Sequence, residues 1–230
     1  MMKEYFITGT DTEVGKTYVT CHLLRAATKA QLLSVGYKPI AAGCDFVNGE
    51  WVNEDAANIQ QASGLSLPIS EINPIALKPP IAPHIAAREE GVILSDKDIE
   101  NGLNTLRAHK ADLLLMEGAG GWRLPLTTDT AETSTRYLSD VISALKMEVI
   151  LVVGMRLGCL NHALLTAEAI RNDGLTIKGW VANDITGNMT RYKENLDSLK
   201  AMLPEPLLAE IPFQRAPDPQ QLAGAISQLV

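Results

Sequence analysis

Short apolar runs alternate along the chain with segments of helical periodicity. The runs at 112–117 and 148–154 are almost wholly apolar, as in strands that are buried on both faces. Further strands are predicted at 4–8, 34–39, 177–184 and 206–212. This pattern predicts an α/β fold with a mainly parallel sheet and helices on both faces.

Helical patterns fall between the predicted strands. They cover 15–33, 53–64, 95–111, 160–174, 192–203 and 219–230. Ser95 and Asp98 have the spacing of a capping box, which predicts a helix start there. The proline-rich segment 65–87 predicts a loop with one short helix near Ile85. Because no linker or repeat is found, residues 1–230 are predicted to form a single domain.

Glycine and polar residues recur where the predicted strands end. In open α/β sheets, ligands bind in the crevice outside the carboxyl ends of the strands. A single residue of this kind would be weak support, but several in succession predict one composite site. They are Gly9, Lys38, Glu117, Gly154, Asn183 and Pro212.

Composition and charge narrow the classes of function. The chain has 230 residues, is 46% hydrophobic and carries a formal charge of −7 without a basic run, which argues against binding nucleic acid. Its three cysteines are far apart and the N-terminus lacks the pattern of a signal peptide, so we expect reduced thiols in a cytoplasmic protein. No apolar run is long enough to span a bilayer, and no membrane role is expected.

A candidate phosphate-binding loop follows the first predicted strand. Gly15, Lys16 and Thr17 end the common pattern G-x-x-x-x-G-K-[ST], but its first glycine is one place early, at Gly9. Backbone N–H groups at the helix start favour an anion, Lys16 would reach the β- and γ-phosphates, and Thr17 would ligate Mg²⁺. The alternative is an ordinary strand–turn–helix in which Thr12 caps the helix.

Three charged residues elsewhere could complete a nucleotide site. Glu117 ends an apolar strand, where a carboxylate would help to hold Mg²⁺ through its oxygens, and glycines follow at once. Lys38 would be a second cation beside a transferring phosphoryl group. Asp55, at a helix start, is a third metal-side candidate. Alone, each could instead be a solvated charge or a partner of the helix dipole.

Two further segments have open interpretations. Glycine and polar groups at 158–161 precede an apolar helix, and could bind an anion at its N-terminus or simply cap it through Asn161. Asn183 and Asp184 at a strand end could bind a base edge or form a turn. Cys159 is interpreted as a small buried residue and not as a reactive thiol.

Five segments together resemble the dethiobiotin synthetase family. They are GTDTEVGKT from residue 9, GYKPIAAG from residue 36, EGAGGW from residue 117, LGCLNHALLT from residue 157 and GWVAND from residue 179. The resemblance runs from residue 3 to residue 214 and is loose at 44–53 and 66–110. The early glycine is this family's own form of the loop.

The resemblance implies an ATP- and Mg²⁺-dependent cyclo-ligase that acts on 7,8-diaminononanoate and CO₂. A carbamate would take the γ-phosphoryl group and form a carbamic–phosphoric anhydride, and the second amine would then close the ring. Lys16 and Lys38 would be catalytic, and Thr17, Asp55 and Glu117 would surround the metal. The nucleotide contacts would be Glu13, Val14, Gly15, Lys16, Thr17, Tyr18, Asp55, Glu117, Gly118, Ala119, Gly120, Asn183, Asp184, Pro212, Phe213 and Gln214.

The resemblance also implies a homodimer with the site at its interface. Gly158, Cys159, Leu160 and Asn161 would then bind the substrate carboxylate from the neighbouring subunit. Ala42 would lie on the diamine side, at a position where the family usually has a serine or threonine hydroxyl. The lost hydrogen bond is worth on the order of 1 kcal/mol, so we expect weaker binding of the diamine.

Three other functions are compatible with a chain that has a phosphate loop. A partitioning or membrane-positioning ATPase switch has a second lysine near the start of the loop, where this chain has Thr10 and Asp11. An amide-forming ligase of the cobalamin type generally carries a glutaminase domain, for which 230 residues leave no room. A paralogue with a different diamine or weak activity stays open because of Ala42.

Overall fold

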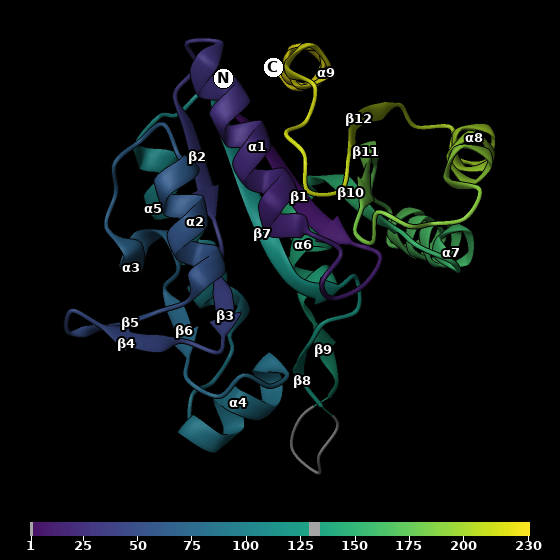
Figure 1. The fold of residues 1–230 in the computed structure, drawn as a ribbon. Coiled ribbons are helices and arrows are strands. Elements are labelled where there is room, and N and C mark those ends of the chain that lie inside the picture. Colours follow the sequence, from purple (N-terminus) through teal and green to yellow (C-terminus); the bar gives the residue numbers. More distant parts are fainter. Residues whose placement is uncertain (1, 129–133) are drawn as a thin grey trace.

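A six-stranded parallel sheet forms the centre of residues 2–128 and 134–230, the part of the chain that the computed structural model describes (Figure 1). Its strand order is β12-β11-β10-β1-β7-β2. The strands are β1 (Lys3–Gly9), β2 (Ser34–Tyr37), β7 (Leu113–Gly121), β10 (Glu148–Met155), β11 (Ile177–Asp184) and β12 (Leu207–Ile211). The predicted parallel sheet is confirmed, with every neighbouring pair parallel.

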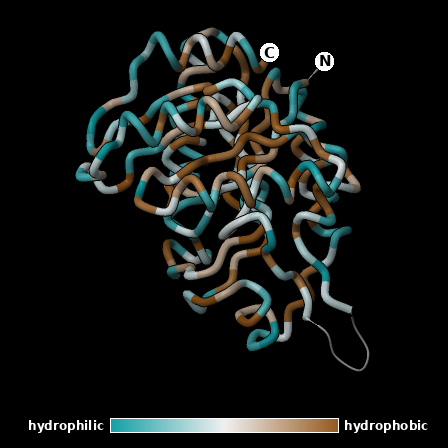
Figure 2. The backbone as a smooth tube through the Cα atoms, turned by 90° about the vertical axis from the view of Figure 1, so that its right-hand side faces the viewer, coloured by the Kyte–Doolittle hydropathy of each residue, from teal (hydrophilic) through white to brown (hydrophobic). Residues whose placement is uncertain are grey.

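The apolar runs form the middle of this sheet. In β7 and β10 the side chains from Leu113 to Met116 and from Val149 to Val153 are all 0% exposed. Such strands need no alternation of polar and apolar residues, because helices cover both of their faces. Figure 2 shows the brown, hydrophobic segments running through the interior, with many of the outer turns teal.

Helices cover both faces of the sheet. α1 contacts α2 and α9, and α1 lies in front of the sheet in Figure 1 while α6 lies behind it. Ser95 caps α5 by accepting a hydrogen bond from the Asp98 amide, as the sequence predicts. The predicted helices correspond to α1 (Lys16–Lys29), α2 (Glu54–Ala62), α5 (Asp96–Ala108), α7 (Cys159–Asn172), α8 (Tyr192–Met202) and α9 (Pro219–Leu229).

The proline-rich segment 65–87 is more ordered than predicted. The short helix near Ile85 is confirmed as α4 (Pro83–Glu90), but the remaining loop assignment is wrong. It contains α3 (Ile69–Ile72) and β6 (Ile75–Leu77), and β6 pairs in parallel with β3 (Ile40–Ala42). Other elements without a prediction are the hairpin β4 (Asp45–Val47) and β5 (Glu50–Val52), the pair β8 (Pro125–Thr127) and β9 (Arg136–Tyr137), and α6 (Leu138–Leu145).

Two strands continue beyond their predicted ends. β7 extends past Glu117 to Gly121, and β10 extends past Gly154 to Met155. Glu117 therefore lies inside its strand, opposite Ile7 of β1, and not at its end. The glycines permit this close pairing, since a Cβ on Gly118 would lie 2.7 Å from Cζ of Phe6.

None of the helices in the described part of the chain has the length and apolar character that a membrane-spanning helix requires.

Candidate active site

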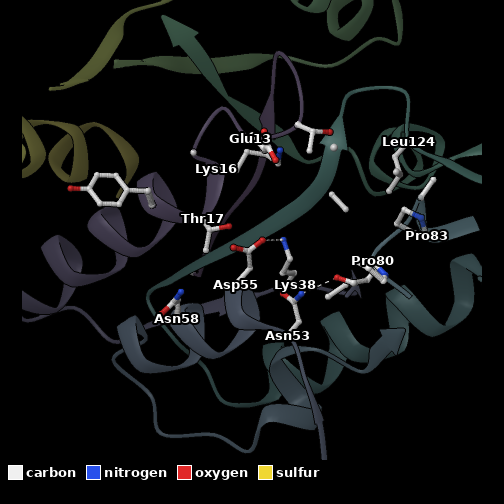
Figure 3. Close-up of a pocket in the computed structure, with 18 of the residues that line it drawn as sticks. Glu13, Lys16, Thr17, Lys38, Asn53, Asp55, Asn58, Pro80, Pro83 and Leu124 are labelled. Carbon is white, nitrogen blue, oxygen red and sulfur yellow. Dashed lines mark hydrogen bonds and ion pairs between the residues drawn. The ribbon is translucent and has the colours of Figure 1, made fainter. Parts of the chain in front are cut away.

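A cavity of about 900 Å³ opens at the carboxyl end of the sheet. The loop after β1, the start of α2 and the turn 80–83 surround it (Figure 3). Lys16 and Thr17 from α1 point into it from one side, and Asp55 and Lys38 meet at its centre. Pro80, Pro83 and Leu124 line an apolar side. The cavity thus combines a charged centre with an apolar wall.

The loop after β1 is held in a strained, compact form. Glu13 has φ 60° and Gly15 has φ 82°, both in the left-handed region, directly before α1. Val14 is buried between two glycines: a Cβ on Gly9 would lie 2.5 Å from Val14 Cγ2, and a Cβ on Gly154 2.7 Å from Val14 Cγ1. The early glycine of the loop is therefore required by packing against Val14.

Asn183 fastens the same loop to β11. Its buried side chain donates a hydrogen bond from Nδ2 to the carbonyl oxygen of Val14 over 2.8 Å. A Cβ on Gly15 would lie 2.1 Å from that nitrogen. The side-chain amide nitrogen of Asn183 thus holds the backbone of the loop, and contact of this residue with adenine stays a prediction.

Lys16 is nearly buried at the base of the cavity. Its side chain donates a hydrogen bond from Nζ to the carbonyl oxygen of Asp11 over 3.2 Å. Burial lowers the pKa of Lys16 from 10.5 to about 8, although Glu117 acts in the opposite direction. The carboxylate of Asp11 forms an ion pair with Arg156 at 2.5 Å, which links the loop to the end of β10.

Glu117 is the centre of a buried network, and its side chain is 0% exposed. Its Oε1 accepts hydrogen bonds from Thr17 Oγ1 and Lys38 Nζ, each over 2.7 Å. Nζ of Lys38 also lies 3.5 Å from Oδ2 of Asp55, which is half exposed. The structure thus brings together the four residues Thr17, Lys38, Asp55 and Glu117.

Lys38 is charged in this setting. Burial on its own would lower the pKa of Lys38, but Glu117 and Asp55 outweigh it and hold the pKa above its ordinary value. A buried ammonium beside two carboxylates is a fixed positive charge in a site of low dielectric constant, where it acts more strongly than in water. Lys38 can therefore stabilise negative charge that develops on a ligand in the cavity.

The donor set suits Mg²⁺. No group of three or more histidine, cysteine or acidic residues that could hold a metal is found in the described ranges. Mg²⁺ is nevertheless commonly bound by one or two carboxylates together with phosphates of the substrate. Thr17, Asp55 and Glu117 offer hard oxygen atoms of this kind at one place, so they fit that ion.

The other predicted nucleotide residues fall into two groups. Ala119 and Gly120 line the cavity, whereas Gly118 packs on Phe6. Of the described residues, those that were predicted to contact the adenine do not line the cavity. This second group lies at the ends of β11 and β12 and consists of Asp184 and Pro212 to Gln214. Gly187 packs there on the ring of Phe213. Nearby, Oη of Tyr18 lies 3.4 Å from the carbonyl oxygen of Arg215.

The predicted substrate residues are also separated. Ala42 lines the cavity, and its carbonyl oxygen accepts a hydrogen bond from Asn53 Nδ2 over 3.0 Å. Gly158, with φ 96°, is the N-cap of α7 and is not among the described residues that line the cavity. It follows Leu157, whose side chain is 93% exposed. Cys159 is buried there, while Leu160 is half-buried and Asn161 is exposed.

Sequence reasoning missed two residues of the site. Thr20 contacts Glu117, and its position one helical turn after Thr17 was the available signal. Asn53 caps α2 through Oδ1 and holds the strand of Ala42 through Nδ2. Its place as the first residue of the predicted helix 53–64 was a capping signal.

Comparison with known proteins identifies the family. A family model described as AAA domain matches residues 3–221. A protein from Alteromonas mediterranea named ATP-dependent dethiobiotin synthetase BioD is 75% identical over 232 residues, covering 99% of this chain and 100% of the relative. Proteins of the same name from Aromatoleum aromaticum and Aeromonas salmonicida are 46% and 47% identical, covering 97% and 98% of this chain and 96% and 97% of their own length.

Solved structures agree on the fold. The signal recognition particle receptor FtsY from Elizabethkingia anophelis, in complex with GDP, superposes with a TM-score of 0.56 at 13% identity, and this chain, covered in full, spans 64% of that one. A ParA family ATPase from Chlorobium tepidum gives 0.54 at 14% identity, over 100% of this chain and 91% of its own. These likenesses confirm the P-loop NTPase-like fold alone. With 75% identity over nearly its full length to a curated relative, the chain belongs to the family of ATP-dependent dethiobiotin synthetases.

Proposed function

We propose that this protein is an ATP- and Mg²⁺-dependent cyclo-ligase that converts 7,8-diaminononanoate and CO₂ to dethiobiotin in biotin biosynthesis. Its family membership supports the overall reaction. The structural observation that carries the proposal is the buried contact of Lys38 with Glu117, which also accepts a hydrogen bond from Thr17 of the phosphate loop. The proposal is supported because a buried cation, oxygen groups that suit a metal and the candidate phosphate loop meet in one cavity.

The chemistry needs positioning and charge stabilisation more than a nucleophile of the protein. One amine of the diamine adds to CO₂ and loses a proton, which gives a carbamate. The carbamate oxygen attacks the γ-phosphorus and ADP leaves, and the second amine then attacks the carbonyl carbon and releases phosphate. Burial raises the pKa of the Cys21 thiol to about 11, so this cysteine in the cavity wall stays neutral and no thiolate competes.

Each part of the cavity has a task in this scheme. Lys16 and the amides of the loop hold the β- and γ-phosphates. Thr17, Asp55 and Glu117 hold magnesium, which supplies positive charge to the phosphates when it is bound. Lys38 stabilises the carbamate and the phosphoryl oxygens. The apolar wall at Pro80, Pro83 and Leu124 offers a surface for the carbon chain of the diamine.

Two binding regions lie outside the cavity. Asn183, Asp184 and residues 212–214 would hold the adenine beside the start of α1, where the hydroxyl of Tyr18 contacts the carbonyl oxygen of Arg215, the residue after Gln214. Residues 158–161 would bind the substrate carboxylate from the partner subunit of a homodimer. The N-terminus of α7 suits an anion, because its first amides and its dipole favour negative charge.

The proposed function is tested by coupled product measurement. Phosphate release from ATP with Mg²⁺ and bicarbonate is followed with and without the diamine, and dethiobiotin is detected by mass. Phosphate and dethiobiotin that form together, and only with the diamine, are the expected result. ATP hydrolysis that ignores the diamine would instead support an ATPase switch or a paralogue with another substrate.

The lowered pKa of Lys16 makes nucleotide binding depend on pH. Above pH about 8 the amine of the free protein loses its proton, whereas a phosphate favours the ammonium form. We therefore expect the Kd for ATP to be flat below pH 7 and to rise by up to about tenfold per pH unit above pH 8. Calorimetry in two buffers of different ionisation enthalpy should show proton uptake at pH 8.5, and a Kd that stays flat up to pH 9.5 would contradict this assignment.

Ala42→Ser tests the diamine side of the cavity. A hydroxyl at this position restores a hydrogen-bonding group, worth on the order of 1 kcal/mol, so the KM for the diamine should fall by roughly fivefold. The KM for ATP, measured in the same assays, should stay unchanged. A diamine KM that is unchanged or higher would show that the missing hydroxyl does not limit substrate binding.

A further inference from the structure

Thr20 contacts the side of Glu117 that faces away from the other partners. It lies in α1 one turn after Thr17, and its side chain is completely buried. Its Oγ1 lies 2.7 Å from Oε2 of Glu117, whereas Thr17 and Lys38 both contact Oε1. Within residues 2–128 and 134–230, Thr20 is the one hydrogen-bond donor to Oε2.

The hydroxyl proton of Thr20 has two acceptors within reach. The second is the carbonyl oxygen of Lys16, at 2.9 Å and one turn earlier in the helix. A hydroxyl donates only one proton, and a hydrogen bond to an ionised carboxylate is shorter and stronger than one to a neutral carbonyl. The proton therefore goes to Glu117, and the carbonyl of Lys16 keeps its helical hydrogen bond.

Thr28 in the same helix shows the ordinary behaviour of a helical threonine. Its Oγ1 donates to the carbonyl oxygen of Leu24 over 3.2 Å, the back-bonding pattern typical of threonine in helices. Its other neighbour is the hydroxyl of Ser34, and neither lines the cavity. Thr20 differs because its hydroxyl reaches a charged side chain on another element, 97 residues away in the chain.

The contact fixes the plane of the carboxylate. The last torsion of a glutamate side chain is broad and roughly two-fold, so packing alone does not select its angle. One donor on Oε2 and two donors on Oε1 select it, and they direct Oε1 toward Thr17 and Lys38. Without the Thr20 hydroxyl, Oε2 would be buried and unpaired, and the carboxylate could turn to share the remaining donors.

We propose that Thr20 is a positioning residue: its hydroxyl holds Oε2 of Glu117 so that Oε1 stays directed at Thr17 and Lys38, where it would help to hold magnesium. The inference rests on the magnesium site of the proposed function. It does not depend on which substrate accepts the phosphoryl group.

The test measures binding without turnover. The affinity for ATP is determined by calorimetry with Mg²⁺ and with EDTA in the absence of the diamine, and the ratio of the two gives the gain due to the metal. Partners that orient a metal ligand typically contribute 10- to 100-fold, so Thr20→Val should reduce this gain by about tenfold or more. Its affinity in EDTA should stay unchanged, because the loop and Lys16 are intact.

Matched variants separate positioning from packing. Thr20→Ser keeps the hydroxyl and should retain the gain, although it loses a methyl group from the core. Thr28→Val removes a hydroxyl from the same helix away from the cavity and should also retain it. Thr20→Ala provides a second variant without the hydroxyl should Thr20→Val fold poorly, and unfolding midpoints are measured for all four.

The outcomes are distinct. A full metal-dependent gain in both Thr20→Val and Thr20→Ala, with only a lower unfolding midpoint, would overturn the inference, because the hydroxyl would then serve packing alone. The inference would be supported if Thr20→Val and Thr20→Ala lose the metal-dependent gain in affinity and Thr20→Ser retains it. A wild-type protein that binds Mg²⁺ and ATP in this way but forms no dethiobiotin would refute the proposed reaction and leave the role of Thr20 standing.

Discussion

Lys38→Ala is expected to lower kcat by about a thousandfold or more, because a fixed cation beside a transferring phosphoryl group is worth 10²- to 10⁵-fold in comparable sites. The variant also leaves the fully buried carboxylate of Glu117 without its cation. Removal of one partner of a buried ion pair typically costs about 3–5 kcal/mol of stability. Steady-state turnover and the free energy of unfolding should therefore both be measured.

A second change separates these two effects. In the double variant Lys38→Ala with Glu117→Gln, the unpaired buried charge is gone, so much of the stability should return while kcat stays as low as in Lys38→Ala or lower. Arg107→Ala is the matched control, since it breaks the ion pair with Glu4, at 2.6 Å on the outer part of the fold, and should leave kcat unchanged. A Lys38→Ala protein that keeps more than about a tenth of the wild-type kcat would exclude Lys38 from charge stabilisation.

Gly15→Ala is expected to raise the Kd for ATP by roughly 30- to 150-fold, which corresponds to about 2–3 kcal/mol. About 1–2 kcal/mol arises because an alanine is strained at a φ of 82°. The rest arises because its Cβ would lie 2.1 Å from Nδ2 of Asn183 and would displace the hydrogen bond to Val14. The loop should relieve the backbone strain and the clash by changing to a conformation that no longer holds phosphate. Calorimetry with ATP measures the resulting loss of affinity.

Gly174→Ala is a suitable control for backbone strain. Gly174 has φ 79°, almost the value of Gly15, but a Cβ there would meet no atom within 4 Å. Its variant should lose some stability and keep the wild-type affinity for ATP. Equal affinities in the Gly15→Ala and wild-type proteins would show that the loop can bind phosphate in another conformation.

The sheet and the loop could be predicted because their signals are local. The apolar runs of β7 and β10 predicted strands buried on both faces, and the order strand–glycine–Gly15-Lys16-Thr17–helix predicted the phosphate site. Because the carboxyl ends of parallel strands share one edge, Lys38 and Glu117 could be predicted to lie near the loop, although Glu117 lies inside β7 and not at its end.

The errors and omissions arise from contacts between distant residues. The strand β6 has three residues, and it forms because β3, which follows the bend at Pro39, pairs with it. The extension of β7 beyond Glu117 depends on the fit of Gly118 against Phe6. Strand propensity is a property of such surroundings more than of the segment itself. In the same way, only tertiary packing decides that the amide of Asn183 reaches the loop.

The anchoring of the phosphate loop has a consequence for the kinetics and thermodynamics of nucleotide binding. The loop is held by three contacts within the protein. Val14 packs against Gly9 and Gly154, Asn183 of β11 donates a hydrogen bond to the loop, and Arg156 after β10 forms an ion pair with it. A preorganised loop loses little conformational entropy when a ligand arrives, and that loss otherwise weakens affinity. Association with ATP should accordingly be rapid and single-step, with differences in affinity among loop variants expressed mainly as differences in dissociation rate.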